Sequence, residues 1–124
     1  MSQGPETRFY RSIHKLLPPE VYKVKMSNPY TGGIPDCWYS GNTGDLWVEY
    51  KWGSNSLSAL QKDWIQKRRA EGRRVWVVTG NKLGGTVDPF GAGPSQYTKA
   101  EIAELIAEAT IESNTKIKKS SRRK

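Results

Sequence analysis

Two short segments decide the expected fold, and they read Gly33-Ile34-Pro35-Asp36 and Val48-Glu49-Tyr50-Lys51. Aromatic and β-branched residues follow the first segment and make up much of the second, which predicts a strand at each place. Because side chains alternate between the faces of a strand, Glu49 and Lys51 are expected on one face. Burying such a pair is costly unless a site uses both charges. If the strands pair, Asp36 converges on Glu49, and two converging carboxylates suit Mg²⁺.

Two further blocks follow in order, Leu57-Ser58-Ala59-Leu60-Gln61 and Gly72-Arg73-Arg74-Val75-Trp76-Val77-Val78. The Asp36 segment and Glu49-Tyr50-Lys51 resemble the PD-(D/E)XK nuclease pattern. With the two later blocks, the stretch from about residue 6 to 79 is similar to the VRR-NUC branch of that superfamily. The resemblance implies an α/β (α+β) restriction-endonuclease-like core, which is a mixed sheet flanked by helices in the order αβββαβ, with a C-terminal helix after it.

The resemblance also implies an activity, hydrolysis of DNA phosphodiester bonds by a metal-dependent endonuclease. Asp36, Glu49 and the main-chain carbonyl of Tyr50 would hold Mg²⁺ or Mn²⁺. Lys51 would contact the scissile phosphate or the attacking water. Gln61 would orient water or Lys51. A glutamate in the first helix, Glu6, would act as a further carboxylate near the metal.

Three of these residues also have simpler explanations. Glu49 and Lys51 could form an ion pair on an exposed sheet face. Ser58-x-x-Gln61 matches a capping box, which would account for Gln61 structurally. Glu6 falls in the first turn of its helix, where the macrodipole favours an acid. Spacing alone does not separate these explanations from the catalytic ones.

The coarse pattern predicts one domain over residues 1–112, followed by a basic tail, 113–124, which is expected to be disordered. Proline and glycine positions and apolar spacing predict a helix at 6–17, strands at 21–25, 37–39 and 47–51, a helix at 58–71, a strand at 75–79, a mobile loop or short hairpin at 80–94, and a helix at 98–112. The strand–helix–strand order near the end predicts one parallel pair in an otherwise antiparallel sheet. Leu57, Leu60, Trp64 and Ile65 are expected to form the apolar stripe of the second helix.

The charge pattern predicts contacts with nucleic acid. The net charge is +8, and the last nine residues hold six Lys or Arg and no acid. A second basic group lies at the end of the 58–71 helix, where a solvated face is the simpler explanation. The candidate DNA-binding residues are Lys67, Arg68, Arg73, Lys116, Lys118, Lys119, Arg122, Arg123 and Lys124.

Several classes of protein are excluded by the sequence. One Cys and one His rule out a Cys/His zinc site and an intrachain disulfide. A reducing compartment is expected, the cytoplasm, or the host cytoplasm if the protein is viral. No apolar run approaches the ~20 residues of a membrane span, and no signal-peptide core is present. The absence of a P-loop motif argues against a nucleotide cofactor.

The expected substrate and partner come from the resemblance. Small stand-alone VRR-NUC proteins resemble virus-encoded enzymes of DNA recombination that resolve Holliday junctions as homodimers. Branched DNA and a second copy of the chain are therefore the expected partners. The alternatives are a nicking or flap endonuclease and a non-catalytic basic protein that binds nucleic acid. Five Trp suggest an exposed interface. The candidate elements are the last helix around Ile102, Leu105 and Ile106 and the strand surface near Trp38 and Trp47, and the simpler explanation is that these residues all fill the core of the monomer.

Overall fold

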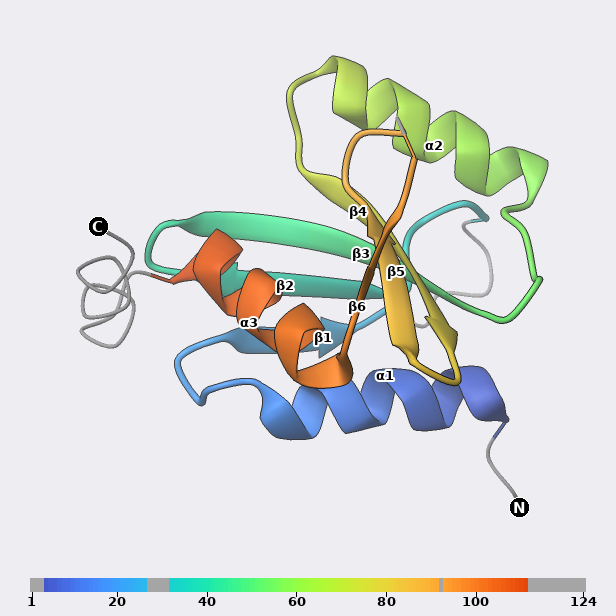
Figure 1. The fold of residues 1–124 in the computed structure, drawn as a ribbon. Coiled ribbons are helices and arrows are strands. Elements are labelled where there is room, and N and C mark those ends of the chain that lie inside the picture. Colours follow the sequence, from blue (N-terminus) through green and yellow to red (C-terminus); the bar gives the residue numbers. More distant parts are fainter. Residues whose placement is uncertain (1–3, 27–31, 92, 112–124) are drawn as a thin grey trace.

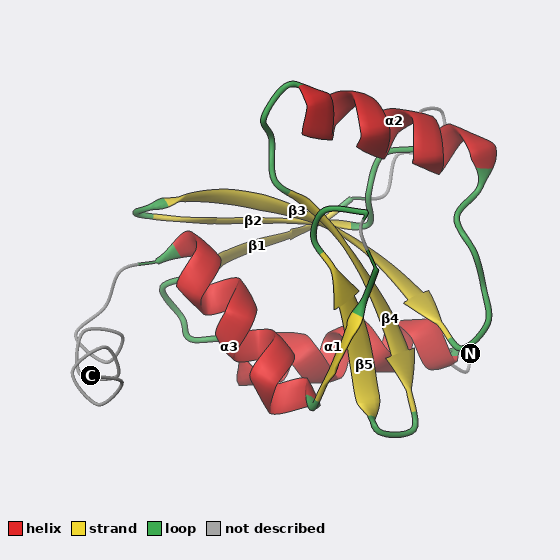
Figure 2. Ribbon diagram, turned by 45° about the horizontal axis from the view of Figure 1, so that its top comes forward, coloured by secondary structure: helices red, strands yellow, loops and turns green. Residues whose placement is uncertain are grey.

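The computed structural model describes residues 4–26, 32–91 and 93–111 of the 124-residue chain. One sheet separates helix α2 from helices α1 and α3, which lie together on the opposite face (Figures 1 and 2). The elements follow in the order α1 (Pro5–Leu16), β1 (Tyr22–Lys25), β2 (Cys37–Gly41), β3 (Gly44–Trp52), α2 (Ala59–Ala70), β4 (Val75–Asn81), β5 (Gly84–Asp88), β6 (Ser95–Tyr97) and α3 (Lys99–Thr110). Among these described residues, no helix is both long and apolar enough to span a membrane.

The six strands lie in the sheet in their order along the chain. Strands β3 and β4 are parallel, and each of the other neighbouring pairs is antiparallel. A parallel pair requires a crossover, which α2 provides between β3 and β4. The predicted single parallel pair is therefore confirmed.

The sequence prediction for residues 80–94 was incomplete. Glycine and proline in this stretch suggested a mobile loop or short hairpin, but β4 continues to Asn81 and turns directly into β5. A third strand, β6, then pairs with β5 before α3 begins. Gly84 and Gly85 are buried within β5, where an added Cβ would meet the β6 backbone or the Phe9 ring. Here glycine marks close packing of the chain and not a loop.

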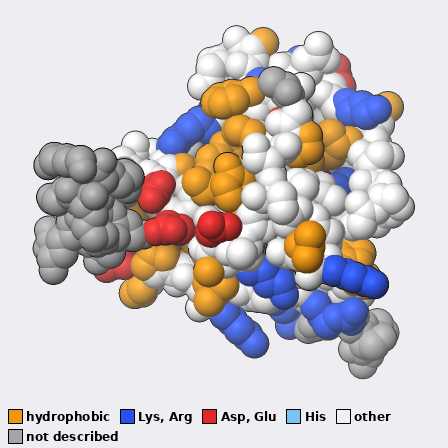
Figure 3. Space-filling view, in the orientation of Figure 1, with side chains coloured by type: hydrophobic (Ala, Val, Ile, Leu, Met, Phe, Trp, Pro, Cys, Tyr) orange, Lys and Arg blue, Asp and Glu red, His pale blue; other side chains and the backbone are white. Residues whose placement is uncertain are grey.

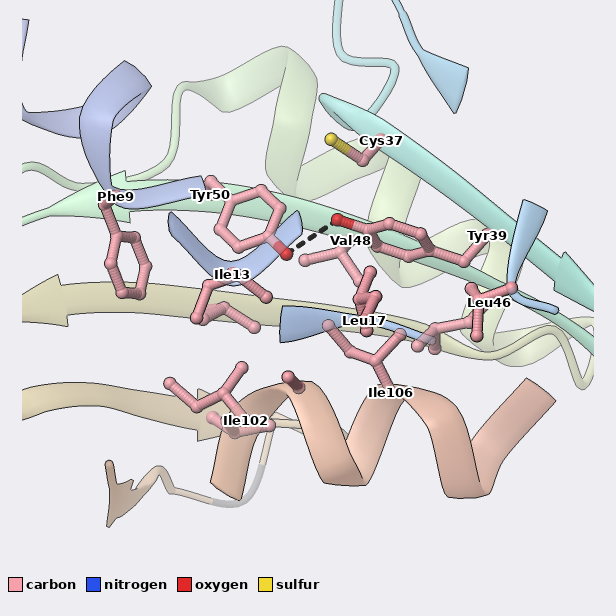
Figure 4. Close-up of a cluster of buried hydrophobic side chains, with 14 of the residues drawn as sticks. Phe9, Ile13, Leu17, Cys37, Tyr39, Leu46, Val48, Tyr50, Ile102 and Ile106 are labelled. Atoms are coloured by element: carbon pink, nitrogen blue, oxygen red, sulfur yellow. Dashed lines mark hydrogen bonds between the residues drawn. The ribbon is translucent and has the colours of Figure 1, made fainter. Parts of the chain in front are cut away.

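The main core lies between the sheet and helices α1 and α3. On β3, Leu46, Val48 and Tyr50 are fully buried on this face, as the alternation of side chains predicts. Figure 4 shows these strand residues meeting apolar side chains of both helices, among them Ile13 and Ile106. Since Ile102 and Ile106 are both 0% exposed, they fill the protein's own core and do not form a subunit interface.

The opposite face of the sheet has a smaller apolar contact with α2. Ile65 and Val75 are buried there, outside the main core cluster. The predicted apolar stripe of this helix was wrong at Leu60, whose side chain is 63% exposed. Leu60 instead lies against Gly32 and Gly33, in the segment before Asp36.

Helix α3 begins at a capping box. The Thr98 hydroxyl accepts a hydrogen bond from the Glu101 N–H, and the Glu101 carboxylate accepts one from the Thr98 N–H, as the Thr-x-x-Glu pattern predicts. The solvent side of α3 is acidic, and Figure 3 shows its acidic side chains gathered beside the end of the described chain. Phosphates would be repelled from this face, so a DNA surface is expected elsewhere on the protein.

Candidate metal and phosphate site

The two carboxylates of the sequence motif lie opposite each other at one end of the β2–β3 ladder. Cys37 pairs with Val48, and continuing that antiparallel register by one residue sets Asp36 against Glu49. The Asp36 Oδ2 atom accepts a hydrogen bond of 2.9 Å from the Tyr50 N–H. This bond holds the Asp36 carboxylate against β3. It takes the place of a backbone hydrogen bond between the strands, because β2 begins only at Cys37.

Glu49 is the most constrained member of the site. Its side chain is 1% exposed, and its Oε2 atom accepts a 2.8 Å hydrogen bond from the Gln61 amide. The Lys51 ammonium lies 3.5 Å from the same oxygen. The other oxygen, Oε1, is buried and has no hydrogen-bond partner among the described residues. Burial, followed by repulsion from Asp36, raises the pKa of Glu49 to about 8.

Gln61 forms the predicted capping box, and its side chain also contacts a carboxylate of the site. Its side-chain oxygen accepts a hydrogen bond from the Ser58 N–H, and its N–H donates to the Ser58 hydroxyl, which completes the capping box of α2. Its amide nitrogen donates to Glu49 at the same time. The cap therefore sets the position from which Gln61 reaches the carboxylate.

Two further charged residues approach from the other side of the sheet. Glu6 lies in the first turn of α1, and its pKa is raised by burial and next by Asp36, while Lys51 lowers it. Glu6 is therefore within electrostatic reach of both residues. The Lys25 ammonium lies 3.9 Å from Asp36 Oδ1. The sequence analysis missed Lys25, whose place follows from its pairing with Cys37 in the β1–β2 register.

The main chain of Tyr50 points towards the same edge. Trp47 donates its N–H across to β4, at the Arg74 carbonyl, whereas Tyr50 donates its N–H to Asp36 on the opposite side. Because the N–H and C=O of one strand residue point the same way, the Tyr50 carbonyl also faces the Asp36 side of β3. Its phenol points into the core, where its hydroxyl is 2.7 Å from that of Tyr39 (Figure 4).

His14 is the only histidine of the chain. The structure places it half-buried, with Nε2 2.7 Å from the Tyr39 hydroxyl. Burial, followed by the positive charge of Lys23, lowers its pKa to about 4. His14 therefore belongs to a hydrogen-bonded row that runs through Tyr39 to Tyr50 beneath the site.

The donor set fits a small hard cation. Among residues 4–26, 32–91 and 93–111, no three or more His, Cys, Asp or Glu side chains form a metal-holding group. Two carboxylates and a carbonyl nevertheless suit Mg²⁺, because this ion keeps several waters and usually binds through one or two protein carboxylates. The buried Oε1 atom of Glu49, which has no partner among the described residues, is the specific observation that favours a cation here.

The loop before Asp36 packs directly against the start of α2. Gly33 has φ +90°, and a Cβ atom there would lie 2.5 Å from the Leu60 carbonyl oxygen. That contact is with backbone, so a substituted side chain could not turn away from it. The contact joins the loop that carries Asp36 to the turn that carries Gln61.

Gly33→Ala is expected to weaken both folding and the site. The positive φ alone costs about 1–3 kcal/mol for a residue with a side chain, and the clash would push the Asp36 loop away from α2. Gly72→Ala is the matched control, since Gly72 has φ +87° with nothing within 4 Å of a Cβ. Thermal melts and metal titrations should show a larger loss for Gly33→Ala. Equal losses in the two variants would mean that the contact with Leu60 does not matter.

The predicted DNA-binding residues that the structure describes gather at the end of α2. Lys67 pairs with Asp63 at 3.2 Å, while Arg68 and Arg73 both pair with Glu71. The Arg68 guanidinium also lies over the Trp64 ring, 5.5 Å from its centroid. The six basic residues predicted in the tail lie outside the described residues: Lys116, Lys118, Lys119, Arg122, Arg123 and Lys124.

Comparison with known proteins gives a likeness among solved structures. No family model matches the sequence, and no curated protein matches it. Among solved structures, the chain is similar to Archaeoglobus fulgidus Hjc, a Holliday junction resolvase from an archaeal hyperthermophile, with a TM-score of 0.51. The match covers 79% of this chain and 99% of the other, at 15% sequence identity. At that identity the likeness shows the fold and not the VRR-NUC branch: the chain has the mixed, helix-flanked sheet of the PD-(D/E)XK fold.

Proposed function

We propose that this protein is a metal-dependent endonuclease that hydrolyses phosphodiester bonds in DNA, with branched junctions as its preferred substrate. The observation that carries the proposal is the state of Glu49. It is a buried carboxylate beside Asp36, with one oxygen held by Gln61 and Lys51 and the other without a partner among the described residues. A purely structural ion pair would not require a free oxygen at 1% exposure.

Each residue has a part in the proposed chemistry. Asp36, Glu49 and the Tyr50 carbonyl would hold Mg²⁺ or Mn²⁺. When bound, the metal ion supplies Lewis acidity to the phosphate and lowers the pKa of a bound water. Gln61 fixes the orientation of the Glu49 carboxylate through its hydrogen bond. Glu6 adds negative charge near Asp36, which supports cation binding as an outer carboxylate.

Lys51 is placed to serve the phosphate. Its side chain is 16% exposed, and its ammonium lies 3.5 Å from the Glu49 carboxylate. In hydrolysis, a water oxygen bonds to phosphorus as the P–O ester bond breaks; the water loses a proton and the leaving oxygen gains one. The ammonium would donate hydrogen bonds to the phosphate oxygens as negative charge grows on them.

The proposed working unit is a homodimer. A four-way junction is resolved by two symmetric cuts, and a two-fold dimer presents two sites related in the same way. Solution mass at micromolar concentration tests this part separately. A monomer that cuts linear duplex as readily as junctions would leave the nuclease proposal standing and remove the junction preference.

Asp36→Asn in a cleavage assay is the direct test of the nuclease proposal. Four-way junctions, flaps, nicked duplexes and linear duplexes are incubated with Mg²⁺, Mn²⁺, Ca²⁺ or excess chelator. Wild type is expected to cut with Mg²⁺ or Mn²⁺, and the variant to lose about 100-fold or more in rate. The amide oxygen of the substituted side chain can still accept the Tyr50 N–H, so the fold should be kept. Undiminished cleavage in excess chelator would contradict the proposal, and binding without any cleavage would favour a non-catalytic nucleic-acid-binding protein.

A further inference from the structure

A row of aromatic side chains crosses the sheet face that α2 only partly covers. It runs from Tyr22 on β1 through Trp38 on β2 and Trp47 on β3 to Trp64 on α2. Neighbouring ring centroids are 6.2, 6.2 and 5.3 Å apart. The Arg68 guanidinium lies over the last ring. These five residues are called the aromatic row below.

The aromatic row is not part of the core. Its three Trp side chains are partly exposed and lie outside the core cluster, whereas Trp52 and Trp76 pack against that cluster. Tyr22 is 63% exposed. A contiguous row of partly exposed aromatic rings on one face is typical of a binding surface.

The row runs alongside the metal and phosphate site. Trp38 and Trp47 are partners in the β2–β3 register, and each is two residues from a carboxylate of the site, Asp36 and Glu49 respectively. Two strand residues span about 7 Å, which is comparable with the reach of one nucleotide. On α2, Trp64 follows Gln61 by three residues and lies on the same side of the helix.

The charge around the row suits a polyanion. The segment from residue 62 to 74, which borders the row, has six Lys or Arg and two acids. Arg74, at the end of this segment, reaches over Gly44 at the β2–β3 turn. Two acids touch the row: the Asp45 carboxylate accepts a 3.0 Å hydrogen bond from the Trp38 indole, and Glu71 pairs with Arg68 at its far end. The hydrogen bond from the indole fixes the Trp38 ring and leaves its face free for stacking.

We infer that the aromatic row is a stacking platform for unpaired bases next to the scissile phosphate, so that, among branched DNAs, those with single-stranded nucleotides beside the cut are the substrate class. Within a duplex, base faces are already stacked and cannot meet an aromatic ring, whereas unpaired bases stack on Trp and Tyr whatever their sequence. Arg68 and the surrounding cations would follow the backbone of the same strand. The inference rests on the proposed function for the position of the cut but not for the binding.

Binding is tested in the inert Asp36→Asn background, so that cleavage plays no part. The probes are an oligo-dT strand, a duplex with an oligo-dT overhang, and a blunt duplex of equal length, each titrated while Trp emission is followed. Trp38→Leu and Trp64→Leu are each expected to weaken oligo-dT binding about 5- to 100-fold. Blunt-duplex affinity should stay nearly constant. Trp76→Phe, on the core face, is the matched control and should bind like the parent.

Salt dependence and solution mass separate the remaining possibilities. Trp38→Leu should lower affinity at every salt concentration with an unchanged slope, whereas Arg74→Ala should reduce the slope. Tyr22→Ser, at the most exposed position of the row, gives the same test if a Trp variant fails to fold.

The inference would be overturned if the row variants weakened blunt-duplex binding as much as oligo-dT binding, or if they bound oligo-dT normally. A dimer that dissociates in Trp38→Leu without loss of oligo-dT binding would overturn it too, because a second copy would then cover the row. Oligo-dT binding through the row by a protein that cuts no DNA would sustain the inference and defeat only the proposed function.

Discussion

Glu49→Gln is expected to abolish cleavage and to make the protein more stable at the same time. The loss of activity should be about 100-fold or more, since one carboxylate of the site loses its charge. The gain in stability follows from the cost of burying that charge. Burial and Asp36 raise the pKa of Glu49 from 4.5 to about 8, so the folded state binds the Glu49 proton more tightly than the unfolded chain does.

The direction of the pH effect follows from this difference. The contribution of Glu49 to stability is fully present below pH 4.5 and is lost as the pH rises towards 8. Each unit of the Glu49 pKa shift corresponds to about 1.4 kcal/mol of unfolding free energy. Removing a cost of that size raises Tm by about 4 °C or more in a domain of this size. In metal-free buffer, the Tm difference between Glu49→Gln and wild type should therefore be small at pH 5 and largest near pH 8.

Two controls make the Glu49 result specific. Glu20→Gln changes an exposed glutamate far along the chain from the site and should alter neither Tm nor cleavage. Added Mg²⁺ should raise the Tm of wild type, because a ligand that binds only the folded state stabilises it, and should leave Glu49→Gln unchanged. If Glu49→Gln instead lowers Tm at pH 8, the Glu49–Lys51 contact is a stabilising ion pair and not part of a metal site.

Much of the site was predictable because it depends on strand alternation and on one antiparallel register. Glu49 and Lys51 share a face because they are two residues apart in a strand. Asp36 meets Glu49 because the Gly41–Gly44 turn between β2 and β3 is short and its glycines pair. The roles assigned to these residues remain proposals, but their convergence was present in the spacing. The fold followed for the same reason, together with the α2 crossover.

The rest depended on contacts that spacing does not encode. Residues 84–88 pair as a strand only because β4 offers a free edge, and their two glycines concealed this. Leu60 fits a helical apolar pattern but lies against Gly32 and Gly33 and is exposed. Lys25 lies beside Asp36 because β1 pairs with β2 in a register that sets Lys25 opposite Cys37. The number of residues between the two strands does not predict that register. The row from His14 through Tyr39 to Tyr50 joins residues 25 and 11 positions apart.

In this proposal the aromatic row binds unpaired DNA, and the carboxylate pair of Asp36 and Glu49 supports the cleavage reaction. Loss of a row residue should weaken binding of unpaired DNA, whereas loss of a residue at the carboxylates should affect the rate. Lys51 is the residue that tests this division most sharply. It lies on the same face of β3 as Trp47 and four residues from it, but its ammonium lies beside the Glu49 carboxylate.

Lys51→Met is expected to reduce the cleavage rate by about 100-fold or more, with DNA affinity almost unchanged. Methionine keeps most of the packed stem and removes the charge, so the loss measures what the ammonium does for the phosphate or the attacking water. The variant should also need a higher pH to bind metal, because the Lys51 charge lowers the pKa of both Glu49 and Glu6. Single-turnover rates, binding of the uncut substrate and a metal titration from about pH 6 to 9 provide the three measurements.

Lys25→Met is the matched control for Lys51→Met. Lys25 also lies beside a carboxylate of the site, but its ammonium is 3.9 Å from Asp36 Oδ1 and its side chain is 39% exposed. Solvent screens such a contact, so its loss should change the rate little. If both lysine variants slow cleavage equally, Lys51 acts only through the net positive charge of the region. If Lys51→Met instead melts at a much lower temperature and its activity falls only in proportion to the unfolded fraction, the Glu49–Lys51 pair is structural, and the catalytic assignment of Lys51 is wrong.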